Sequence, residues 1–381
     1  MAGIYIHIPF CKQKCHYCNF FSSVSNNQKD EFLKSLQLEI GQQKDYLLGE
    51  EILTVYFGGG TPSLLKRAEI EHIIQKLKNT FYISKNAEYT LEVNPDDLSE
   101  DKSKELIDAG INRLSIGVQS FHDEDLKYLN RVHSATQAHR AIEGALKSGF
   151  TNLTIDLIYG IPTLNSENWI KNLNLFFDYR LPHLSAYALT VEPNTPLHVL
   201  ITKNKIAGID EQNMVDHFRI LLELTKTHDF TQYEISNFSK VGYNSKHNSL
   251  YWSGGNYLGL GPSAHSYNGI SRQWNYSSLS KYLKLDDLKT VVYEKEILTT
   301  QQKYNEYVMT SIRTSWGCNL DYISTVFGEE FQQHCKNSAK PHLDSKKLKM
   351  IGNILLLTDN GKLFADGITA DLFYEYKGHL I

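Results

Sequence analysis

The sequence predicts an α/β protein built on a parallel sheet, followed by a smaller, mainly helical C-terminal domain. Six short β-rich runs alternate with amphipathic helical runs over roughly the first half of the chain, and such alternation implies parallel strands joined by right-handed crossovers. The length of 381 residues leaves room for a second domain. Because six units are fewer than the eight of a complete βα barrel, the sheet is predicted to be either doubly wound or closed into a partial barrel.

The individual elements follow from composition and periodicity. The first strand is a run of isoleucine and tyrosine, and the first helix repeats apolar residues such as Phe32, Leu36 and Ile40 along one face. The predicted strands lie at residues 4–8, 54–57, 89–93, 114–118, 154–159 and 183–189. The predicted helices lie at residues 28–47, 67–79, 99–109, 135–148, 165–178 and 210–228.

The βα alternation weakens after the sixth strand, which divides the chain into three parts. We expect the barrel at residues 1–230, a Gly- and aromatic-rich segment at 231–285, and a helical domain at 286–381. That last domain is predicted to end in a strand at 354–357, a turn at 359–361 and a strand at 362–364. A strand–turn–strand after helices is similar to the wing of a winged helix.

Composition and charge exclude several classes of protein. Hydrophobic residues make up 41% and charged residues 22% of the chain, which is typical of a globular protein. The net charge is −4 with no basic block, so we expect no nucleic-acid partner and at most a peripheral association with membranes. The N-terminus lacks a basic segment followed by an apolar core, which predicts a cytoplasmic protein.

Cysteine spacing gives the strongest chemical signal. Cys11, Cys15 and Cys18 fall directly after the first strand, whereas Cys318 and Cys335 are far away and are predicted to be buried thiols without an assigned role. An odd, clustered set favours metal ligation over a disulfide framework. Three thiolates can ligate three irons of a [4Fe-4S] cluster and leave the fourth iron open. Zinc is the rival interpretation, but it requires four ligands, and here it would have to recruit a nearby histidine.

The motif and its context resemble a known superfamily. Cys-x3-Cys-x2-Cys after the first strand is similar to the signature of radical S-adenosylmethionine (SAM) proteins, which implies a partial (β/α)6 barrel. The segment from Tyr5 to Phe20 resembles the oxygen-independent coproporphyrinogen oxidase family more closely. The resemblance covers essentially the whole chain, through residues 58–63, 92–95, 117–121, 156–160 and 233–238.

The resemblance implies a SAM site at the strand ends, with SAM bound to the open iron and cleaved by one electron from the cluster. Glycines in the second strand would let the backbone approach the methionyl amine, so we expect a branched side chain at Gly60 to weaken SAM binding and to leave the fold intact. Arg131 would pair with the SAM carboxylate. The SAM-binding residues implied in this way are Tyr5, Tyr17, Gly59, Gly60, Thr61, Glu92, Gln119, Arg131, Asp156 and Ala188.

Three features separate the two branches of that family. The oxidases carry a fourth cysteine where this chain has Phe20, and they have a long N-terminal extension where only ten residues precede Cys11 here. The HNxxYW sequence that begins at His247 resembles the HemW branch, whose members are regarded as haem chaperones. A neutral imidazole is a good ligand for haem iron, so His247 is the predicted haem ligand, and His265 is a second candidate.

Three functions follow as alternatives. The first is a haem chaperone that transfers haem to apo-haemoproteins such as respiratory enzymes, with an electron donor for the cluster as a further partner. The second is an oxygen-independent coproporphyrinogen III oxidase, which Phe20 and the short N-terminus disfavour. The third is a radical SAM enzyme with another substrate, which the HNxxYW sequence makes less favoured. The expected cofactors and cargo are therefore a [4Fe-4S] cluster, SAM and haem.

Overall fold

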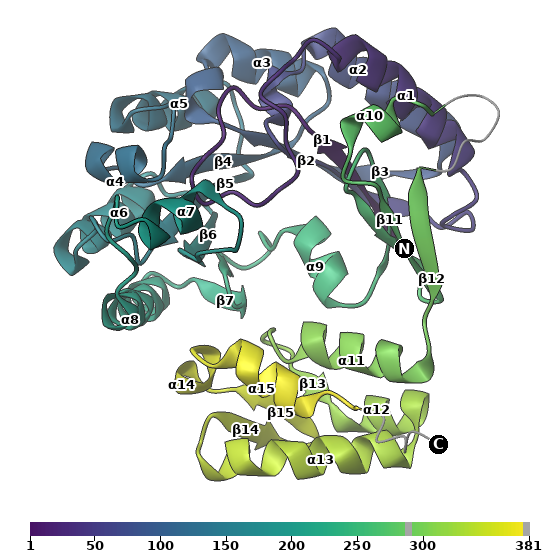
Figure 1. The fold of residues 1–381 in the computed structure, drawn as a ribbon, viewed down its shortest axis with the longest axis vertical. Helices are drawn as coiled ribbons and strands as arrows, with labels where there is room; N and C mark the ends of the chain where they lie inside the picture. Colours follow the sequence, from purple (N-terminus) through teal and green to yellow (C-terminus); the bar gives the residue numbers. More distant parts are fainter. Residues whose placement is uncertain (286–291, 376–381) are drawn as a thin grey trace.

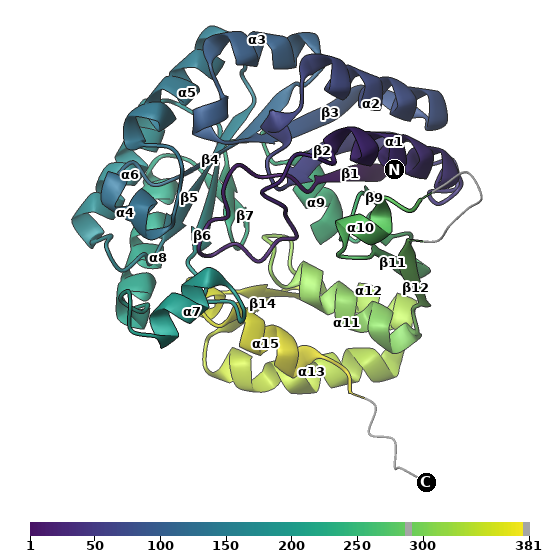
Figure 2. The ribbon, with the colours of Figure 1, turned by 45° about the horizontal axis from the view of Figure 1, so that its top comes forward.

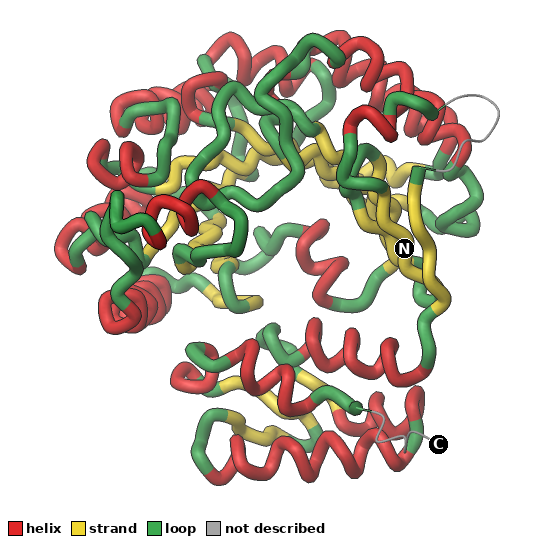
Figure 3. The backbone as a smooth tube through the Cα atoms, in the orientation of Figure 1, coloured by secondary structure: helices red, strands yellow, loops and turns green. Residues whose placement is uncertain are grey.

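A computed structural model describes residues 1–285 and 292–375 of the chain. Its centre is a strongly curved sheet of twelve strands, ordered β12-β11-β10-β9-β1-β2-β3-β4-β5-β6-β8-β7. Helices cover the convex face of the sheet, and a second, smaller group of helices and strands lies across its open side (Figure 1). Figure 2 shows the same arrangement with its top turned forward, and Figure 3 shows the arc of strands inside the shell of helices.

The predicted parallel sheet is confirmed. Strands β1 to β6 are parallel neighbours in chain order. A helix is present at each of the six positions where the sequence predicts one. β9 adds a further parallel strand beside β1, and the outer strands on both sides are antiparallel. The strands of the sheet are β1 Ala2–Ile8, β2 Ile52–Gly59, β3 Ile83–Val93, β4 Arg113–Gln119, β5 Leu153–Tyr159, β6 His183–Ala188, β7 Thr231–Glu234, β8 Asn237–Ser239, β9 Asn256–Leu260, β10 His265–Tyr267, β11 Ser271–Asn275 and β12 Tyr293–Ile297.

The helices begin where the sequence supplies caps. Ser99, Ser134 and Asp210 each accept a backbone N–H of the first turn, which satisfies a donor that the helix itself leaves free. The helices of this part are α1 Lys29–Gln42, α2 Arg67–Thr80, α3 Glu100–Asp108, α4 Asp123–Tyr128, α5 Ala135–Lys147, α6 Ser166–Asp178, α7 Pro196–Thr202, α8 Glu211–Thr227, α9 Lys246–Trp252 and α10 Leu279–Tyr282, with short 3-10 turns at Pro62–Leu64 and Pro95–Asp97.

The smaller C-terminal domain has its own apolar core around Tyr304, Val308 and Ile323. Its three-stranded sheet has the order β13-β15-β14. Cys318 lies on a strand and Cys335 on a helix, and both are free and fully buried, as predicted. The elements are α11 Thr300–Ser311, β13 Cys318–Asn319, α12 Leu320–Phe327, α13 Glu329–Asp344, β14 Leu348–Ile351, β15 Ile354–Leu357, α14 Asp359–Lys362 and α15 Ala365–Leu372.

Two local predictions differ from the structure. Residues 359–361 do not form a turn into a last strand; they begin α14, because the Thr358 hydroxyl accepts the Gly361 N–H and caps a helix there. The hairpin instead joins β14 to β15 through Gly352, which has a φ of 59°. Residues 246–252, which carry the HNxxYW sequence, form the short helix α9 inside a segment with few helix signals.

The boundary at residue 286 lies outside the described residues. Beyond it, β12 still pairs with β11, and the C-terminal domain is joined to the barrel at further points. The Ser315 N–H donates to the Tyr233 carbonyl at 3.0 Å, and Arg313 lies over the Trp252 ring at 5.8 Å from its centre. No helix among residues 1–285 and 292–375 is long and apolar enough to cross a membrane.

Candidate functional site

The cysteine loop follows β1, and backbone hydrogen bonds join its start to its own later part and to the segment after β2. The Cys11 N–H donates to the Ser23 carbonyl at 2.9 Å, and the Thr61 N–H donates to the Phe10 carbonyl at 2.7 Å. Cys11, Cys15 and Cys18 are all half-buried. Within the described chain, no three His, Cys, Asp or Glu side chains are arranged around a single metal ion. A cubane makes no such demand, because each thiolate ligates a different iron.

Arg131 connects this loop to the strand ends. Its guanidinium donates to the Cys15 sulfur at 3.3 Å, to the Asn94 side-chain oxygen at 2.7 Å and to the Gly117 carbonyl at 2.9 Å. Asn94 in turn donates to the Thr61 hydroxyl at 3.1 Å. The Arg131 Nε–H is buried without a hydrogen-bond partner in the described structure. A buried guanidinium with an unpaired N–H can donate it to an anionic group of a ligand. The cost of removing this N–H from water is already part of the folded structure.

Gly59 and Gly60, at the end of β2, lie where the fold has no room for a side chain, which the sequence alone does not show. A Cβ on Gly60 would lie 2.6 Å from the Phe10 carbonyl oxygen and 3.0 Å from the Cys11 sulfur. A Cβ on Gly59, which has a φ of 104°, would lie 2.6 Å from the His7 ring. The expectation that a branched residue at Gly60 leaves the fold intact is therefore wrong, because the space belongs to the cysteine loop itself.

Two buried carboxyl groups lie on alternate strands of the sheet, Glu92 on β3 and Asp156 on β5, with β4 between them. Glu92 accepts the Tyr56 hydroxyl at 2.8 Å, and Asp156 accepts the Ser115 hydroxyl at 3.2 Å. Burial, and then the negative charge of Asp156, raise the pKa of Glu92 to about 7. Burial also raises the pKa of Asp156 to about 6. Both groups therefore titrate close to neutral pH.

The remaining residues of the predicted SAM site are distributed around the same strand ends. Gln119 ends β4 with a φ of 67°, an uncommon conformation for a residue with a side chain and one that recurs at functional sites. Tyr17 lies in the cysteine loop and packs against the main core, and Ala188 ends β6 half-buried. Tyr5 stacks on Tyr56 with 6.0 Å between the ring centres.

A cavity of about 1300 Å³ opens beside this region, between the barrel and the C-terminal domain. Tyr5, Tyr56 and Glu92 line its barrel side, so it is continuous with the predicted SAM site. Large apolar side chains in its lining remain exposed, a feature that marks binding surfaces. They are Phe20, Tyr187, Met309, Trp316, Tyr322 and Val326, and the Phe20 side chain is 64% exposed.

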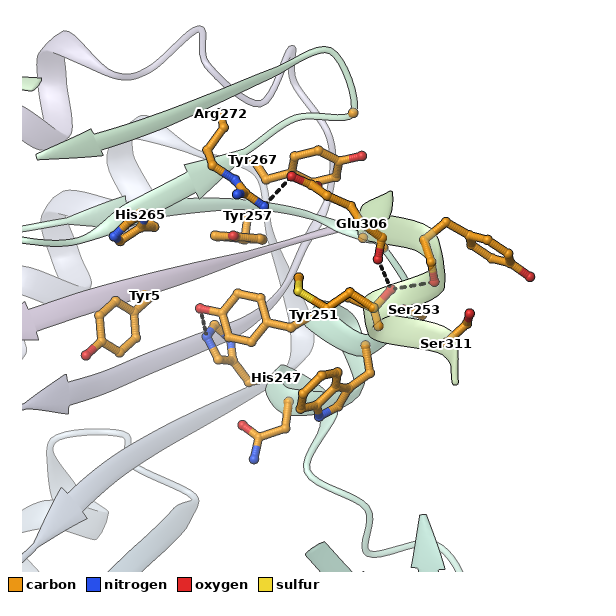
Figure 4. Close-up of a pocket in the computed structure, with 18 of the residues that line it drawn as sticks. Tyr5, His247, Tyr251, Ser253, Tyr257, His265, Tyr267, Arg272, Glu306 and Ser311 are labelled. Carbon is orange, nitrogen blue, oxygen red and sulfur yellow. Dashed lines mark hydrogen bonds and ion pairs between the residues drawn. The ribbon is translucent and has the colours of Figure 1, made fainter. Parts of the chain in front are cut away.

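His247 lines the cavity, but both of its ring nitrogens are occupied. Nδ1 shares a hydrogen bond with the Thr54 hydroxyl at 2.8 Å. Nε2 shares one with the Tyr251 hydroxyl at 2.8 Å, which Figure 4 shows. Burial lowers its pKa to about 3, so the ring is neutral. Its role as a haem ligand stays a prediction, and iron could reach Nε2 only after the Tyr251 hydroxyl turned away.

The C-terminal domain supplies a wall of the cavity that the sequence did not predict. Lys303, Glu306, Tyr307 and Thr310 line the cavity from α11, and Glu306 forms an ion pair with Arg272 of β11 (Figure 4). These four residues recur at intervals of three and four, which places them on one face of a helix. That spacing was the available signal, and only the tertiary structure shows which surface the face covers.

Comparisons with known proteins agree with this geometry. The radical SAM superfamily model matches residues 5–176, and the HemN C-terminal domain model matches residues 298–364. The structure of coproporphyrinogen III oxidase HemN from Escherichia coli, a radical SAM enzyme, superposes with a TM-score of 0.84 at 22% identity, covering 98% of this chain and 90% of that one. At that identity the likeness concerns the fold alone.

The fold and the cysteine loop thus define a radical SAM protein. Similar curated proteins identify the family within this superfamily. The protein named Heme chaperone HemW of Bacillus subtilis is 31% identical over 100% of both chains, and that of Lactococcus lactis is 30% identical over 94% of this chain and 93% of its own. The HemW of Escherichia coli is 36% identical over 69% of each chain. The chain belongs to the HemW family of radical SAM proteins.

Proposed function

We propose that this protein is a haem chaperone: it binds haem in the cavity between the barrel and the C-terminal domain and transfers it to apo-haemoproteins such as respiratory enzymes. The observation that carries the proposal is the cavity itself, whose exposed aromatic and aliphatic lining suits a large, flat, mostly apolar ligand. The names of the relatives, Heme chaperone HemW, support the same function. The free thiols suit the reducing cytoplasm as the place of action.

The proposed resident cofactors are a [4Fe-4S] cluster on Cys11, Cys15 and Cys18, and SAM at the adjacent strand ends. The residues fit both groups: three thiols share one loop, and the unpartnered Arg131 Nε–H can take the SAM carboxylate. Glu92 and Asp156 supply acceptors for its ribose hydroxyls and amine, beside Tyr5, Tyr17, Gly59, Gly60, Thr61, Gln119 and Ala188. When bound and reduced by an electron donor, the cluster and SAM supply one-electron chemistry.

SAM binding should strengthen with pH, because SAM carries a sulfonium and an ammonium group. Below about pH 6 both Glu92 and Asp156 are neutral, and above about pH 7 both are negatively charged. We therefore expect the affinity to rise by about tenfold between pH 5.5 and pH 8. Isothermal titration of the anaerobic holoprotein with SAM at several pH values measures this.

The control compares two glutamate variants. Glu92→Gln should flatten the part of the profile near pH 7, whereas Glu71→Gln, in an exposed pair with Arg67 on α2, should leave it unchanged. Asp156 and Arg113, the charged groups on β5 and β4, remain in both variants. A wild-type affinity that is constant over this range would contradict the placement of SAM beside Glu92.

The proposed function is tested by two assays on the same reconstituted protein. The holoprotein should bind hemin with a distinct Soret band and pass it to an apo-haemoprotein, and it should not convert coproporphyrinogen III. If the protein converts coproporphyrinogen III with multiple turnovers, it is an oxidase and not a chaperone. The cavity would then hold the substrate beside the predicted SAM site, because Tyr5 and Glu92 line both. Phe20 occupies the position of the oxidases' fourth cysteine and is exposed in the cavity, so we expect the chaperone outcome.

A further inference from the structure

One wall of the cavity is an antiparallel extension of the sheet. In its register Tyr257 of β9 lies opposite Tyr267 of β10, which lies opposite Arg272 of β11. His265 precedes Tyr267 by two residues, so the two side chains point to the same face. This wall therefore presents an imidazole, two phenol rings and a guanidinium to the cavity, as Figure 4 shows.

His265 differs from the other two histidines of the cavity. His7 and His247 are buried, and each has hydrogen bonds at both ring nitrogens. The His265 ring is exposed, and among the residues that the structure describes it has no hydrogen bond at either nitrogen. It stacks on Trp274, directly opposite on β11, with 6.5 Å between ring centres. The indole thus orients a ring whose nitrogens remain free.

The surroundings of His265 favour the neutral form of its ring, which is the form that ligates metals. Partial burial, and then the positive charge of Arg272, lower its pKa below the usual value. Arg272 is itself paired with Glu306 of α11. Lys303, one turn earlier on α11, lines the same cavity and forms no ion pair with any described residue. The cavity thus holds a free nitrogen ligand on one wall and a free cation on the other.

We propose that His265 ligates the iron of haem in this cavity and that Lys303 pairs with a haem propionate. The proposal rests on the proposed haem-binding function and names its ligand. It assigns the iron to His265 rather than to His247 of the HNxxYW sequence. His265 offers a nitrogen without loss of a hydrogen bond, whereas His247 would first have to lose its bond to Tyr251.

The test titrates the reconstituted full-length protein with hemin and, separately, with metal-free protoporphyrin IX. His265→Ala should weaken hemin binding by about tenfold and shift the Soret band, while protoporphyrin binding stays unchanged, because only the iron bond is lost. Added imidazole should restore the wild-type Soret position. Lys303→Glu should weaken both ligands by about tenfold without moving the Soret band.

Two matched variants complete the design. His72→Ala removes an exposed histidine from α2 on the outside of the barrel and should bind both ligands like the wild type. His247→Ala should keep the wild-type Soret position under this proposal. Iron–sulfur absorbance and circular dichroism verify that every variant is folded.

The possible failures are distinguishable. If the wild type binds hemin and His265→Ala keeps its spectrum and affinity, this proposal is overturned and the haem-chaperone function stands. An equal loss of hemin and protoporphyrin in His265→Ala also overturns it, since the ring would then only pack. If the wild type binds neither hemin nor protoporphyrin, the proposed function itself fails.

Discussion

Replacing Cys15 with alanine should remove most of the iron from the anaerobically reconstituted protein. The wild type is expected to hold about four iron and four sulfide per chain, bound through three thiolates with one iron left open to SAM. With two thiolates left, the cluster would have only two protein ligands. The change also removes the sulfur that accepts from Arg131 at 3.3 Å, which frees a buried guanidinium. Iron and sulfide analysis of the purified protein measures the loss.

Cys335→Ala is the matched control for that experiment. Cys335 is a buried free thiol in the core of the C-terminal domain, so its loss should cost some stability but no iron. Full cluster retention in Cys15→Ala would contradict the ligand assignment. Zinc in place of iron in the wild type would contradict the prediction of an iron–sulfur cluster.

The strands and helices of the barrel could be predicted from the sequence because each is marked by a local pattern of residues. β1 to β6 are short runs of apolar and β-branched residues, and the helices between them repeat apolar positions at helical intervals and begin at Ser or Asp caps. The pairing of β9 with β1 joins residues about 250 positions apart, for example Ala2 with Asn256. No local pattern encodes such a partner, so the extension of the sheet to twelve strands was not predicted.

In the candidate site, too, some features follow from local sequence and others depend on the tertiary structure. The spacing of Cys11, Cys15 and Cys18 predicts a metal-binding loop on its own. The environment of His247 could not be predicted, because its hydrogen-bond partner Thr54 is 193 residues away in the sequence. The freedom of His265 is equally a property of the tertiary structure, since it depends on which side chains surround the ring. Sequence patterns therefore named both candidate histidines and placed His247 first, but they carry no information on the hydrogen bonds that each ring makes in the fold.

Replacing Gly60 with alanine should destabilise the protein and release the cluster, a larger effect than the loss of SAM affinity that the sequence suggests. The new Cβ would lie 2.6 Å from the Phe10 carbonyl oxygen and 2.8 Å from the Ile8 carbonyl oxygen. Both are backbone atoms of the segment that leads into the cysteine loop, so they cannot turn aside as a side chain could. Overpacking of this kind costs about 1–3 kcal/mol.

Gly367→Ala is the control that separates this clash from a general effect of losing a glycine. Gly367 lies in the exposed part of α15 with nothing within 4 Å of its Cβ position, so alanine there should raise stability by up to about 1 kcal/mol through helix propensity. Chemical unfolding of the apoprotein and iron content of the holoprotein are measured for both variants. Because the Gly60 N–H donates to the Ile8 carbonyl at 2.8 Å, the clash pushes apart the backbone groups that hold the start of the cysteine loop against β2. Wild-type unfolding and full iron content in Gly60→Ala would mean that the loop can move away without losing its metal-binding geometry.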